Sequence, residues 1–65
     1  MSKYQQAKDS LNAYAIEIRK QYQTDKPAQR QALNDYTDSL IRDHQLSQRE
    51  QDWLCSYCCT LHPKK

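Results

Sequence analysis

Apolar side chains recur at intervals of three or four residues along most of this chain, and this periodicity constrains its fold more than any other feature. Two short stretches, 24–27 and 43–46, interrupt the pattern. A period of three to four residues gathers apolar side chains on one face of an α-helix. The sequence therefore predicts three helices, over about residues 3–23, 26–43 and 48–61. The expected inward residues of the first two are Tyr4, Ala7, Leu11, Tyr14, Ile18, Tyr22, Ala32, Leu33, Tyr36 and Leu40.

The third predicted helix has the clearest start signal in the chain. Ser47 followed by Glu50 is a capping-box pattern, in which the serine hydroxyl accepts from the Glu50 N–H and the glutamate accepts from the Ser47 N–H. Pro63 ends the helix, because proline disfavours the helical conformation of the residue before it. We assign one face of this helix to the core, namely Trp53, Leu54, Tyr57 and Leu61.

The composition favours helices in a single small domain. The 65 residues include no glycine, valine or phenylalanine, and they are rich in the helix formers Gln, Ala, Leu, Lys and Arg. Short connections favour antiparallel neighbours. We therefore expect an all-α fold, a three-helix arrangement of two longer antiparallel helices and a capped C-terminal helix, followed by a basic tail at 62–65. Because the apolar stripes are narrow and rich in Tyr and Ala, we expect a homodimer or a larger partner to complete the core.

Charge, hydropathy and cysteine content argue against several functional classes. The formal net charge of +2 is mild for a dedicated nucleic-acid-binding protein. The longest apolar run, residues 13–16, is far shorter than the roughly 20 residues of a membrane span. Three cysteines without a secretory segment indicate a reducing cytoplasm. Because no catalytic or cofactor motif is evident, we predict a cytoplasmic protein that is not an enzyme, holds no cofactor and does not bind membranes.

The remaining class is a protein-binding module. Trp, Tyr and Arg, which dominate binding hot spots, are all present on this polar chain. Short, polar chains are also typical of accessory proteins encoded by phages, plasmids or other mobile elements, which adds the expectation of a regulator or inhibitor of a larger protein. The residues predicted to contact the partner lie off the apolar stripes and are Ile16, Arg49, Cys55, Cys59 and His62. An incidental exposed isoleucine is the simpler interpretation of Ile16.

A DNA-binding regulator is the main alternative. A helix, a short turn and a capped helix form the outline of a helix-turn-helix, whose reading residues would be Gln48, Arg49 and Gln51. Glutamine pairs well with adenine and arginine with guanine in the major groove. Against this interpretation, Glu50 and Asp52 place negative charge beside those side chains, and the turn lacks the glycine often found there.

A small zinc-binding protein is the third alternative. Thiolate and imidazole are ligands that zinc prefers. The candidate ligands are Cys55, Cys58, Cys59 and His62, with His44 as a further imidazole. Structural zinc sites usually take a Cys-x-x-Cys pair from a turn, whereas this pair lies within a helical pattern. The simpler interpretation is that the cysteines are small packing residues.

Overall fold

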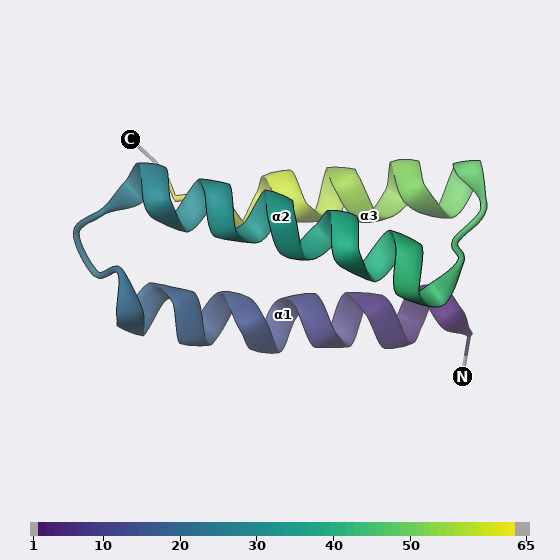
Figure 1. Ribbon diagram of the computed structural model, residues 1–65, viewed down its shortest axis with the longest axis horizontal. Coiled ribbons are helices and arrows are strands. Elements are labelled where there is room, and N and C mark those ends of the chain that lie inside the picture. Colours follow the sequence, from purple (N-terminus) through teal and green to yellow (C-terminus); the bar gives the residue numbers. More distant parts are fainter. Residues whose placement is uncertain (1, 64–65) are drawn as a thin grey trace.

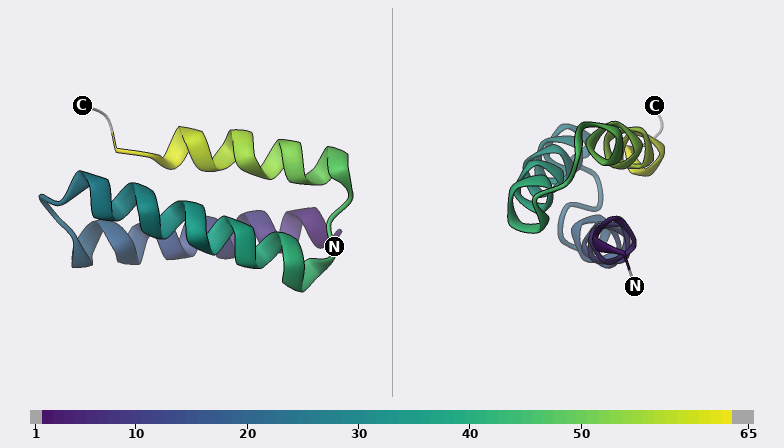
Figure 2. Two further views of the ribbon diagram at one scale, coloured as in Figure 1. Left: turned by 45° about the horizontal axis from the view of Figure 1, so that its top comes forward. Right: turned by 90° about the vertical axis from the view of Figure 1, so that its right-hand side faces the viewer.

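The structure, a computed structural model, describes residues 2–63, and that range folds into three α-helices and no strand. α1 spans Lys3–Gln21, α2 spans Lys26–His44 and α3 spans Gln48–Leu61. Successive helices run antiparallel, so α1 and α3 point the same way (Figure 1). Seen end-on, the helices occupy the corners of a triangle (Figure 2). The predicted all-α, three-helix fold is confirmed, although α1 ends two residues before the predicted position 23.

The starts of α2 and α3 are fixed by local side-chain caps. The Asp25 carboxylate accepts a hydrogen bond from the Ala28 N–H at 3.2 Å, and Pro27 lies in the first turn, where its missing N–H costs nothing. The predicted capping box of α3 is present. The Glu50 N–H donates to Ser47 Oγ at 3.3 Å, and the Ser47 N–H donates to Glu50 Oε1 at 3.1 Å.

α2 ends in a Schellman motif that is built around a glutamine instead of the usual glycine. Gln45 adopts the left-handed conformation, with φ 51° and ψ 53°. Its N–H donates to the Arg42 carbonyl at 3.3 Å, and the Leu46 N–H donates to the Ile41 carbonyl at 3.1 Å. These bonds satisfy carbonyls that the helix end would leave free. They also turn the chain so that Leu46, 5% exposed, enters the core.

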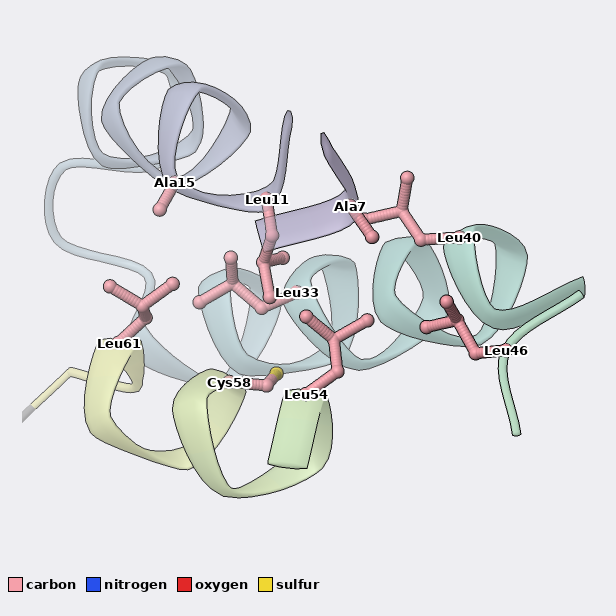
Figure 3. Close-up of a cluster of buried hydrophobic side chains, with 9 residues drawn as sticks. All are labelled: Ala7, Leu11, Ala15, Leu33, Leu40, Leu46, Leu54, Cys58 and Leu61. Atoms are coloured by element: carbon pink, nitrogen blue, oxygen red, sulfur yellow. The ribbon is translucent and has the colours of Figure 1, made fainter. Parts of the chain in front are cut away.

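The core lies between the three helices, and each helix contributes side chains to it (Figure 3). Its largest fully buried residues are Leu11 on α1, Leu33 on α2 and Leu54 on α3. The other members are Ala7, Ala15, Leu40, Leu46, Cys58 and Leu61. Because Ala7 and Ala15 are small, they leave room for the leucines of the other two helices. Four tyrosines, by contrast, are partly buried and pack around the edge of this cluster, namely Tyr4, Tyr14, Tyr36 and Tyr57.

The core differs from the sequence expectation on α3. Trp53, assigned to the core, is 50% exposed, whereas Cys58 is only 2% exposed. The buried row is Leu54, Cys58 and Leu61, and it points between α1 and α2 because α3 packs against both. Trp53 lies about 100° around the helix from Leu54 and so falls at the edge. The assignment of Trp53 is wrong, those of Leu54 and Leu61 are confirmed, and Tyr57 is partly buried.

One chain encloses this core within extents of 34 × 18 × 15 Å. Its buried polar side chains are hydrogen-bonded, since the Thr37 hydroxyl donates to the Leu33 carbonyl at 2.8 Å and the Gln29 amide donates to the Tyr22 carbonyl. Completion of the core by a homodimer stays a prediction. None of the helices in residues 2–63 combines the length and the apolar character that a membrane crossing requires. The lysines of the predicted basic tail, at 64–65, lie outside the described residues.

Candidate functional site

The surface between α2 and α3 carries an open groove of about 220 Å³ that all three cysteines line. The cysteines occupy positions i, i+3 and i+4 of α3, on the side that faces α2. Two of the thiols, those of Cys55 and Cys59, are exposed, and that of Cys58 is buried. We call this feature the thiol groove, and its lining residues are Asn34, Thr37, Asp38, Ile41, Cys55, Cys58 and Cys59.

At one end of the thiol groove, Cys58, His62 and Asn34 have the composition of a cysteine-nucleophile triad but not its geometry. Cys58 Sγ, at 3.6 Å, and Asn34 Oδ1, at 3.0 Å, both approach the same imidazole nitrogen, Nε2. A triad uses both nitrogens, one to take the thiol proton and the other to be held by the third residue. The cluster instead ties the end of α3 to α2.

The charge state of this cluster also disfavours a thiolate. Burial is the main cause that raises the pKa of Cys58 above its ordinary value. Burial, and after it the positive charge of Arg30, lowers the pKa of His62, so the imidazole stays neutral to lower pH. A neutral imidazole supplies no positive charge to stabilise a neighbouring thiolate. The arrangement therefore favours the thiol form of Cys58.

Two of the predicted contact residues, Cys55 and Cys59, do lie together at the thiol groove, but His62 departs from their line. If the helix continued through His62, its spacing would place that residue in one row with Cys55 and Cys59. In the structure α3 ends at Leu61, and His62, with φ −61° and ψ 144°, leaves the helical path and meets Asn34 on α2. Burial and then the Asp52 carboxylate raise the pKa of Cys55, so its exposed thiol also stays protonated.

The zinc alternative gains no support from the placement of its ligands. Within residues 2–63, no group of three or more His, Cys, Asp or Glu side chains is arranged to hold a metal ion. His44 ends α2 beside the α2–α3 connection, whereas His62 follows the far end of α3 (Figure 1). The two imidazoles therefore lie at opposite ends of the bundle.

The opposite side of α3, where it meets α1, carries aromatic rings. Tyr4 and Trp53 meet edge to face, with ring centroids 5.6 Å apart and planes at 66°. This T-shaped geometry is one that aromatic pairs prefer. One turn farther along the seam, Lys8 Nζ lies 4.8 Å from the centre of the Tyr57 ring, within cation–π range.

Arginines extend this aromatic seam at both ends. Arg19 on α1 reaches the C-terminal end of α3, where its Nη2 donates to the Leu61 carbonyl at 3.5 Å. Arg49 is exposed and precedes Trp53 by four residues, so the two share one face of α3. We call this surface the α1/α3 face and define it by Tyr4, Lys8, Arg19, Arg49, Trp53 and Tyr57. Of this set, only Arg49 is predicted as a contact residue from the sequence, because the cross-helix partners of the others are non-local.

The helix-turn-helix alternative does not fit the arrangement of α2 and α3. The two helices run antiparallel side by side (Figures 1 and 2), whereas a helix-turn-helix crosses its helices at about 90–120°. Two of the proposed reading side chains are also engaged. The Gln48 amide donates to Asp52 at 3.2 Å, and the Gln51 amide donates to the Leu46 carbonyl at 3.1 Å.

The predicted contact residues thus fall on separate surfaces. Ile16 is 47% exposed on α1, Arg49 belongs to the α1/α3 face, and Cys55 and Cys59 line the thiol groove. Periodicity could identify these side chains as outward-facing but could not say which neighbours they share. A comparison with known proteins found no matching family model, curated protein or solved structure. Function is therefore inferred from the geometry of these two surfaces.

Proposed function

We propose that this protein binds another protein through the α1/α3 face and acts as a regulator or inhibitor of that partner. The observation that carries the proposal is the half-exposed Trp53, which Tyr4 holds edge-on at 5.6 Å. A tryptophan held in place before binding loses little conformational freedom when a partner covers it. Trp, Tyr and Arg are also the residues that contribute most to binding energy in protein interfaces.

The Trp53 side chain is not part of the buried core. Within residues 2–63, the exposed large hydrophobic side chains are those of Ile16 and Trp53. Ile16 is not among the residues that define the α1/α3 face, whereas Trp53 belongs to its cluster of aromatic and cationic groups. The three free cysteines suit a reducing compartment, so the cytoplasm remains part of this proposal.

Affinity capture tests the proposal with two matched variants. The full chain is immobilised and exposed to a lysate of the source organism with and without nuclease, and bound proteins are measured by mass spectrometry. Trp53→Ala should abolish capture of a stoichiometric partner while circular dichroism shows that the helices persist. Ile16→Ala, which truncates a side chain of similar exposure, should retain the partner.

The reverse pattern would overturn the proposal. If Ile16→Ala loses the partner and Trp53→Ala retains it, the binding surface lies on α1 alone. If every co-purifying protein disappears on nuclease treatment, the chain binds nucleic acid, and the protein-binding proposal fails.

A further inference from the structure

We infer that the α1/α3 face takes an acidic peptide segment of the partner, with an apolar side chain of that segment against Trp53. This inference rests on the proposed function and adds the chemistry of the ligand. It follows from three features of the face: the cations that cross the seam, the carboxylates that pair with other groups, and the single open aromatic ring system.

Cations lie along the whole length of the seam. Lys8 sits over the Tyr57 ring at 4.8 Å, and Arg19 donates to the Leu61 carbonyl at 3.5 Å. Both side chains are thereby directed from α1 towards α3. Arg49 adds a third positive charge beside Trp53, one helical turn away. The result is a row of positive charge in which the aromatic pair lies between Arg49 and Lys8.

The carboxylates of α1 and α3 have partners of their own, and the ion pairs within the described residues, Glu17–Lys20 and Asp38–Arg42, include none of these cations. Glu50 accepts the Ser47 N–H in the capping box, and Asp52 accepts the Gln48 amide and lies close enough to raise the pKa of Cys55 on the α2 side.

On α1, the acidic groups bond along their own helix. Asp9 accepts the Gln5 amide at 2.9 Å, and Glu17 lies 4.0 Å from Lys20. The positive charge of the α1/α3 face is thus available to an incoming anion. Complementary charge across an interface guides the choice of partner and speeds association.

A single-stranded nucleic acid fits the face less well than a peptide. Such strands bind by stacking successive bases on several aromatic platforms. Here Lys8 already covers the Tyr57 ring, so the Tyr4–Trp53 pair is the one open platform on the face within the described residues. A peptide needs a single apolar contact flanked by charge, and this is the arrangement that the face presents.

Selection from a random peptide library tests the inference even though the partner is unidentified. Displayed peptides of 14 residues, the length of α3, are panned against the full chain, and the bound pool is sequenced. We expect enrichment of Asp and Glu around an aromatic or aliphatic residue, and loss of this enrichment with Trp53→Ala. For the enriched peptides, Lys8→Gln and Arg49→Gln should each raise the Kd by about two- to fivefold. The increase should be smaller at high salt.

Lys20→Gln is the matched control, because it removes a lysine of α1 that pairs with Glu17 instead of facing α3. It should leave the Kd unchanged. A bound pool with no excess of Asp and Glu, or equal effects of Lys20→Gln and Lys8→Gln, overturns the inference. So does binding of a labelled oligothymidylate that Trp53→Ala abolishes. If affinity capture still yields a partner that requires Trp53, the proposed function survives any of these failures.

Discussion

Trp53 and Leu54 are adjacent in the sequence but contribute differently to stability. Leu54 is 0% exposed at the centre of the core, and Trp53 is 50% exposed at its edge. Leu54→Ala should lower the free energy of unfolding by about 2–5 kcal/mol, because it leaves a cavity. Trp53→Ala should cost about 1–2 kcal/mol, from partial burial and the Tyr4 contact. Urea unfolding followed by circular dichroism measures both free energies. A larger loss for Trp53→Ala than for Leu54→Ala would show that Trp53 is part of the core.

For single residues, the sequence predicted which side chains are buried better than it predicted which residues they contact. Leu11, Leu33 and Leu54 are buried as their spacing predicts. Trp53 and Cys58 lie about 140° apart around α3, near opposite edges of its apolar stripe, and Cys58 is the one that is buried. Which of them is buried depends on where the other two helices lie. His62 follows the predicted end of α3, and helical spacing could not place it because its contact with Asn34 on α2 is non-local.

Among the helices, the end of α2 offers the clearest place for a stabilising change. Gln45 holds the left-handed conformation at φ 51°, which a Cβ atom disfavours. Gln45→Gly should raise the free energy of unfolding by about 0.5–1 kcal/mol, after allowing for the greater freedom of glycine in the unfolded chain. Gln45→Ala is the control, because it removes the same side chain but keeps Cβ. Equal unfolding midpoints for the two variants would show that the left-handed conformation carries no strain.

Helix starts were predictable from the sequence, and two of the three helix ends were less so. The capping box joins Ser47 and Glu50 within one turn, so its signal is local and complete in the sequence. The end of α2 has no such signal, because a glutamine occupies the position where glycine is expected. α1 likewise ends at Gln21 without a proline or glycine near its last turn, and the apolar stripe continues to Tyr22. Periodicity alone therefore extended α1 too far.

For the whole molecule, neither surface could be read from the sequence, because each is made by two helices. The thiol groove needs Ile41 and Thr37 of α2 beside the cysteines, and the α1/α3 face needs Tyr4 beside Trp53. Both pairings join residues far apart in the chain. Their formation depends on how the helices pack, which the periodicity of any single helix does not specify.

The closed core also leads to a prediction about association. The sequence suggested that a second chain or a partner completes the core, because the apolar stripes are narrow. In the structure the side chains of one chain fill it, and no buried side-chain N or O atom of the described residues lacks a hydrogen-bond partner. Since a dimer that stabilises the fold raises Tm with protein concentration, the Tm of this protein should be independent of concentration. A Tm that rises with concentration, and ceases to rise in Trp53→Ala, would instead show that two copies associate through the α1/α3 face.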